Sequence, residues 1–156
     1  MRNISLIDTS VYLNILDVAG FNQDRATILP EVTRRIEQTT LLLPFVVILE
    51  SGNHISKLPD GRVRRKCATR LVTDVARAVN GETPYAPTYF PARSEFLGWL
   101  ADFPDFAMRN RSSSKPHLGI SLADYSIIKE WERTRELNPT KRVTIWSLDS
   151  DLGAYS

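Results

Sequence analysis

Hydrophobic and polar positions along the chain fall into short apolar runs separated by longer stretches with helical spacing. The apolar runs at 4–7, 41–43 and 143–146 predict buried strands. Between them, apolar side chains recur every three or four residues, which predicts amphipathic helices. These helices are expected over 9–20, 24–38, 44–52, 62–79, 96–103 and 121–138. Strands joined by helices cannot form hairpins, so the pattern predicts an α/β fold with a parallel sheet covered on both faces.

Two segments show neither the apolar runs of buried strands nor the helical spacing of apolar residues. Residues 80–91 contain Pro84, Pro87 and Pro91 and predict an extended loop, whose aromatic residues we expect to be exposed. Residues 109–116 are polar and basic and predict a mobile surface loop. A chain of 156 residues is long enough for one domain with its own core, so we expect a single domain over 1–156.

Composition narrows the class of protein. Lys and Arg total 20 against 18 Asp and Glu, so any nucleic acid must be bound by a local basic patch. The single cysteine, Cys67, excludes an internal disulfide and a cysteine-rich zinc site. The longest apolar run, 41–49, is about half of the roughly 20 residues that a membrane span needs. The sequence opens without the pattern of a signal peptide, and we expect a cytoplasmic protein.

Four acidic residues lie where a parallel sheet binds its ligands. Asp8 directly follows the first strand, and Asp149 follows the last. Glu50 ends an apolar stretch in its helix, and Asp124 lies in the first turn of another. Carboxylates gathered at one edge repel unless a cation neutralises them, and all-oxygen ligation selects Mg²⁺ or Mn²⁺. Such a metal activates water and stabilises charge on a phosphate, which indicates phosphoryl chemistry.

Simpler roles remain open for most of these acids. Asp8 is also a suitable helix cap, and Asp124 is also suited to the positive end of a helix dipole. Asp151 competes with Asp149 for the same role, because it follows two residues later. Glu50 is harder to explain without a site, because a carboxylate in apolar surroundings needs a partner.

The order and context of these acids resemble those of the PIN-domain ribonucleases. The segment Leu6–Ser10, with the sequence Leu-Ile-Asp-Thr-Ser, is similar to the opening of that family, where an Asp-Thr/Ser pair ends the first strand. Glu50 after Pro44 resembles the second acid of the family, and Asp124 before two isoleucines resembles the third. Ser147–Asp149 resembles its Thr/Ser-x-Asp signature. The likeness covers nearly the whole chain.

The resemblance implies a three-layer α/β/α domain with a central, mainly parallel sheet. It implies an endoribonuclease that hydrolyses single-stranded RNA with Mg²⁺ or Mn²⁺, and a toxin or defence effector whose partners include an antitoxin or a second copy of the chain. The implied catalytic and metal-binding acids are Asp8, Glu50, Asp124 and Asp149, with Asp151 as the alternative to Asp149. Ser10 and Ser147 are implied to support the acids by hydrogen bonds.

The middle of the chain departs from the compact toxins of this family. The stretch between Glu50 and Asp124 is longer, and residues 80–116 are the expected insertion. Two basic segments are candidates for holding an RNA backbone, with a solvated helix face and an ordinary polar loop as the alternatives. The candidate residues are Arg62, Arg65 and Lys66 in the first segment and Arg109, Arg111 and Lys115 in the second.

Other function classes fit the sequence less well. The same fold without catalysis, as an RNA-binding or protein-interaction scaffold, is disfavoured by the complete set of four acids. A phosphatase of the haloacid-dehalogenase type needs an Asp two residues after the first, where Ser10 stands. A response-regulator receiver needs an acidic pair after its first strand, whereas Thr9 follows Asp8.

Overall fold

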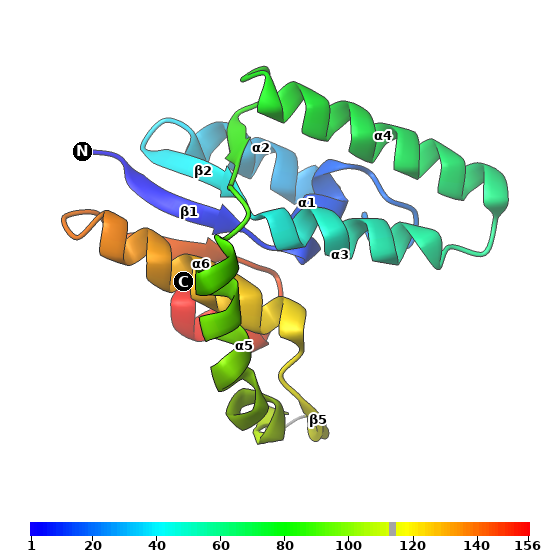
Figure 1. Cartoon of the computed structure of the whole chain (residues 1–156). Helices are drawn as coiled ribbons and strands as arrows, with labels where there is room; N and C mark the ends of the chain where they lie inside the picture. The colour runs from blue at the N-terminus through cyan, green and yellow to red at the C-terminus, as the bar shows by residue number, and fades with distance from the viewer. Residues whose placement is uncertain (113–114) are drawn as a thin grey trace.

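A four-stranded parallel sheet forms the centre of the protein (Figure 1). The computed structural model describes residues 1–112 and 115–156. The strands of the sheet are β1 (Asn3–Ile7), β2 (Thr39–Leu43), β3 (Tyr85–Pro87) and β6 (Val143–Trp146). They lie in the order β3-β2-β1-β6, and each pairs in parallel with its neighbour. The first and last strands of the chain are therefore adjacent.

Helices cover both faces of this sheet. Leu6 and Ile7 point to opposite faces because they are consecutive in β1, and both are fully buried. On one face, Trp131 packs against the cluster of Ile4 and Leu6, and on the other Arg35 stacks over the ring of Trp146. The helices are α1 (Thr9–Ile15), α2 (Arg25–Arg35), α3 (Phe45–Ser56), α4 (Gly61–Val79), α5 (Arg93–Met108), α6 (Leu122–Leu137) and the 3₁₀ helix η1 (Ser150–Tyr155).

This arrangement confirms the predicted fold class. Helix α6 lies over the face that carries Leu6, and α1 and α2 lie on the opposite side, which gives three α/β/α layers (Figure 1). The three predicted strands are present within one or two residues of their expected bounds. In the ranges that the structure describes, no helix is long and apolar enough to cross a membrane.

The Pro-rich segment 80–91 differs from the predicted loop because it contributes the edge strand β3. Tyr85 in this strand is buried, contrary to the expected exposure, whereas Tyr89 and Phe90 are exposed. The hydroxyl groups of Tyr85 and Tyr12 both donate to the Asp74 carboxylate of α4, at 2.8 and 2.7 Å. Pairing with β2 and these hydrogen bonds hold the segment in place despite its prolines.

The basic segment 109–116 was also predicted wrongly as a loop. Arg109 is the C-cap residue of α5, and 113–114 lie outside the described residues. The rest of the segment belongs to an antiparallel pair of strands, β4 (Asn110–Ser112) and β5 (Lys115–Gly119). Strand β5 passes close to the end of α5, where a Cβ atom on Gly119 would lie 2.3 Å from the Ala107 carbonyl oxygen. Glycine permits this close approach. The expected insertion 80–116 therefore contains β3, α5 and most of this hairpin.

The buried acid Glu130 of α6 connects this helix to the segment after β3 and to the start of α3. The Glu130 side chain is fully buried, and its Oε1 atom accepts hydrogen bonds from the Thr88 hydroxyl at 2.7 Å and from Arg133 at 3.1 Å. The Thr88 hydroxyl in turn accepts from the backbone N–H of Phe45, at the start of α3. The Oε2 atom of Glu130 has no hydrogen-bond partner among the described residues. Burial raises the pKa of Glu130 to about 7, although Thr88 and Arg133 act in the opposite direction.

We predict that this carboxyl makes the free energy of unfolding fall as the pH rises from about 4.5 to about 7. Below this window both states hold the proton, and within it the unfolded chain loses the proton first. Glu130→Gln should reduce the fall by up to about 3 kcal/mol, because one pKa unit corresponds to about 1.4 kcal/mol.

Urea unfolding at a series of pH values measures this effect. Glu136→Gln, which changes an exposed acid on the same helix, should leave the pH dependence as in the wild type. An unchanged pH dependence in Glu130→Gln would contradict the prediction.

Candidate functional site

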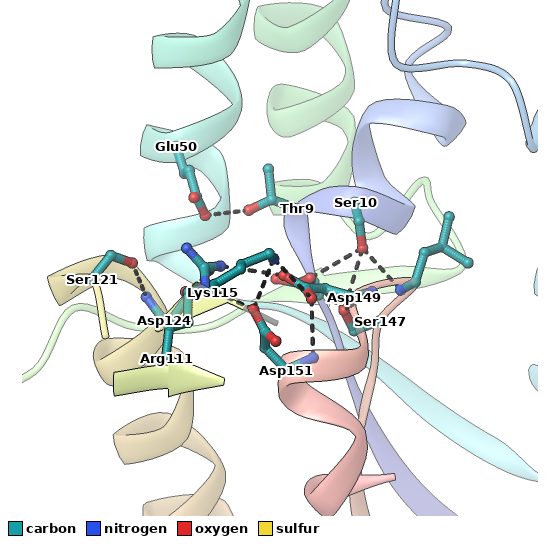
Figure 2. A network of polar contacts seen from close by, with 12 residues as sticks. Thr9, Ser10, Glu50, Arg111, Lys115, Ser121, Asp124, Ser147, Asp149 and Asp151 are labelled. Carbon is teal, nitrogen blue, oxygen red and sulfur yellow. Dashed lines mark hydrogen bonds and ion pairs between the residues drawn. The ribbon is translucent and has the colours of Figure 1, made fainter. Parts of the chain in front are cut away.

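The acids identified in the sequence lie at the carboxyl edge of the sheet. Because Ile7 of β1 is in register with Trp146 of β6, the segments that follow these parallel strands leave the sheet together. They carry Asp8 and Asp149, respectively. Helix α3 begins after β2 at this same edge, and α6 begins beside it at Ser121 (Figure 2). Strands β1 and β6 and helices α3 and α6 thus bring together residues from the whole length of the chain.

Asp8 is held by two serine hydroxyl groups. Its side chain is 5% exposed, and its Oδ2 atom accepts from Ser147 at 2.7 Å and from Ser10 at 3.0 Å. The Ser147 hydroxyl accepts from the backbone N–H of Asp149, and that of Ser10 accepts from the N–H of Leu148. Each hydroxyl therefore donates once and accepts once, which fixes the Asp8 carboxylate between the ends of β1 and β6.

Glu50 has a partner that the sequence did not assign to it. The Thr9 hydroxyl, buried at the start of α1, donates to its Oε2 atom at 2.5 Å (Figure 2). The sequence indicated Thr9 only as part of the Asp-Thr-Ser segment. The N-cap position of α1 belongs to Asp8, so the Thr9 hydroxyl is available to Glu50.

Asp124 lies in the most strongly perturbed surroundings of these acids. Its backbone N–H donates to the side chain of Ser121, which is the N-cap residue of α6. Burial raises the pKa of the Asp124 carboxyl to about 6, and the charges of Glu50 and Asp8 act in the same direction. Arg111 opposes this rise but does not cancel it. Glu50 and Asp8 are therefore close enough to Asp124 to act on its carboxyl electrostatically.

Arg111 of β4 is the cation on which the remaining contacts converge. Its Nη2 atom lies 2.8 Å from Oδ2 of Asp124 and 3.2 Å from Oδ2 of Asp149. Its Nε atom donates to Oδ2 of Asp151 at 2.7 Å. Although burial works against the charged guanidinium, the neighbouring carboxylates raise the pKa of Arg111. One guanidinium thus links three carboxylates at the edge of the sheet (Figure 2).

Lys115 of β5 adds a second, more exposed cation. Its Nζ atom lies 3.0 Å from Asp151 and 4.0 Å from Asp149. Lys115 and Arg111 together hold the pKa of Asp151 below its usual range. The Asp151 side chain is 7% exposed and that of Asp149 is 26% exposed. Both acids that the sequence left as alternatives therefore belong to this cluster.

The other basic candidates lie apart from the acids. Arg62, Arg65 and Lys66 are exposed on α4, and the Arg109 guanidinium stacks 4.6 Å from the centre of the Phe106 ring. Within 1–112 and 115–156, no ion pair joins any of these four residues to the acids described above. Of the six basic candidates, the structure brings only Arg111 and Lys115 to the acidic edge.

The cluster has the donor chemistry of a hard-cation site but not its spacing. Its carboxylates are oxygen donors of the kind that Mg²⁺ and Mn²⁺ prefer. Among the described residues, however, no three acidic, histidine or cysteine side chains are arranged to hold a metal ion directly. The carboxylates of Asp124, Asp149 and Asp151 are directed at the Arg111 guanidinium instead.

No protein-family model matches the chain, and a search of curated proteins finds no significant match.

We predict that Ser147→Ala lowers the free energy of unfolding by about 1–2 kcal/mol, because it removes one of the two hydroxyl partners of Asp8 and the acceptor of the Asp149 N–H together. Urea unfolding of the metal-free protein measures the change. Ser56→Ala is the matched control, since that exposed hydroxyl bonds only within its own helix, and it should be near neutral. Equal stability of the two variants would show that the Ser147 hydroxyl does not hold the edge together.

Proposed function

We propose that the protein is a PIN-type endoribonuclease that hydrolyses single-stranded RNA with Mg²⁺ or Mn²⁺. The observation that carries this proposal is the convergence of five carboxylates from four segments of the chain on one edge of a parallel sheet. Two cations, Arg111 and Lys115, face these acids, so a negative charge is left that a divalent ion would offset. The acids follow one another along the chain in the same order as those of the PIN-domain ribonucleases that the sequence resembles.

The residues that would hold the ion are Asp8, Glu50, Asp124 and Asp149, after a change from the observed arrangement, in which no three acidic side chains of the described residues are placed to hold a metal ion directly. When bound, the ion would lower the pKa of a water molecule and offset charge on the phosphate. The Ser10 and Ser147 hydroxyl groups keep Asp8 oriented, and the Thr9 hydroxyl does the same for Glu50. In the proposed reaction the water oxygen bonds to phosphorus and the P–O3′ bond breaks, which leaves a 5′-phosphate and a 3′-hydroxyl group.

The partly exposed Lys115 supports RNA as the substrate. Its side chain is 41% exposed beside the acids, where it is accessible to the backbone of a bound strand. Tyr89 and Phe90 are exposed on the segment that follows β3 and offer ring faces on which bases can stack. We propose a cytoplasmic location on the basis of the single, buried cysteine.

A non-catalytic RNA-binding or protein-interaction scaffold is the second candidate. The contact of Arg111 with three of the acids favours it, because an internal cation already compensates part of their charge. The two candidates differ in metal binding. A scaffold neither requires nor binds a divalent ion at the acids, whereas the nuclease depends on one.

The test is cleavage of a labelled single-stranded RNA pool with Mn²⁺ and with a chelator. Changes in groups that only orient metal ligands cost about 10- to 100-fold in activity, so Asp8→Asn, which alters an acid itself, should cost about 100-fold or more. The chelator should abolish cleavage by the wild type. Asp105→Asn, an exposed acid of α5, is the control and should cleave as the wild type does. Cleavage by folded Asp8→Asn at the wild-type rate would overturn the proposal.

A further inference from the structure

We propose that Arg111 competes with a divalent cation for the acidic cluster, so that the cation binds only when the guanidinium withdraws. This inference rests on the proposed function, because it takes the acidic cluster to be the ion site. In this proposal a single residue of the β4–β5 hairpin, Arg111, controls the affinity of the cluster for the metal ion. The hairpin thereby contains an autoinhibitory contact.

The first support is the geometry of the guanidinium. Asp124 and Asp149 each direct an Oδ2 atom at Nη2, and Asp151 directs an Oδ2 atom at Nε, all within 2.7–3.2 Å. Carboxylate oxygens bind Mg²⁺ at about 2.1 Å, in directions that converge on the ion. The same oxygens cannot meet both demands while the guanidinium lies between them. An ion that takes these Oδ2 atoms and the observed position of Arg111 therefore exclude each other.

The second support is burial. The side chains of Arg111, Asp124 and Asp151 are 23%, 14% and 7% exposed, so water screens their charges less than it would at an open surface. Removing the guanidinium would leave Asp124 without its ion-pair partner and Asp151 with Lys115 alone, a state that is costly until another cation arrives. The same charge that stabilises Arg111 in the cluster thus favours Mn²⁺ once Arg111 is absent.

The third support is the element that carries the residue. Strands β4 and β5 form a sheet of their own, separate from the four-stranded sheet. The withdrawal of Arg111 therefore breaks no hydrogen bond of the central sheet. Asp8 and Glu50 keep their hydroxyl partners in the process, because among the described residues no hydrogen bond or ion pair joins either of them to Arg111. The cluster can exchange one cation for another while its other carboxylates stay in place.

The test measures Mn²⁺ affinity directly, without RNA. Metal-free protein is titrated with Mn²⁺, and free Mn²⁺ is followed by electron paramagnetic resonance and the heat of binding by calorimetry. Arg111→Gln should bind Mn²⁺ about 10- to 100-fold more tightly than the wild type, because the wild type is competent only in the fraction of molecules from which Arg111 has withdrawn. Arg109→Gln, two residues away and stacked on Phe106, should bind as the wild type does.

Two further variants separate displacement from a simple effect of charge. Lys115→Gln removes the same unit of charge beside the same acids but leaves Arg111 in place, so its gain in affinity should be clearly smaller. Arg111→Lys keeps the charge but cannot join three carboxylates in one plane, so its affinity should exceed that of the wild type. Equal gains from Lys115→Gln and Arg111→Gln, with none from Arg111→Lys, would overturn the proposal.

Asp8→Asn distinguishes the failure of this inference from the failure of the proposed function. If Asp8→Asn loses Mn²⁺ binding while Arg111→Gln equals the wild type, the ion site stands and the competition is disproved. If no folded variant binds Mn²⁺, the ion site fails, and the inference fails with it. If Arg111→Gln does not fold without metal, Arg111→Lys decides, and wild-type affinity in that variant contradicts the proposal.

Discussion

Electrostatic repulsion among the carboxylates at the edge of the sheet is the constraint on which the rest of the site depends. Different contacts offset this repulsion at different acids. Asp8 and Glu50 receive hydrogen bonds from hydroxyl groups, whereas Asp149 and Asp151 face Arg111. Asp124 is only partly compensated, and its pKa is raised to about 6. This incomplete compensation is the ground on which we propose a divalent cation at the site.

The fold creates this constraint by bringing distant segments together. Asp8 and Ser147 are 139 positions apart in the chain, yet they share a hydrogen bond because β1 and β6 are parallel neighbours. The hairpin then supplies Arg111 from a segment outside the central sheet. The α/β/α core therefore fixes the acids, while a peripheral element supplies the charge that compensates them. This division allows the compensation to change without rearrangement of the core.

The features that local residue patterns determine could be predicted from the sequence. The features that depend on contacts between distant segments could not. The runs at 4–7, 41–43 and 143–146 are apolar enough to be recognised as strands, and the acids that follow them could be placed at one edge. Strand β3 was missed, because three residues that include a proline carry no period and depend on pairing with β2. The contact between Thr9 and Glu50, 41 positions apart, has no local signal. Arg111 could be named as basic, but not as the partner of three acids.

The central claim is that the acidic cluster is a site for a divalent cation, and crystallography at the manganese absorption edge tests it most directly. In crystals grown with Mn²⁺, we predict an anomalous peak bounded by Asp8, Glu50, Asp124 and Asp149, with the Arg111 guanidinium withdrawn from them. Crystals in which Arg111 still contacts Asp124 and Asp149, with no peak at a manganese concentration far above that in cells, would contradict the claim.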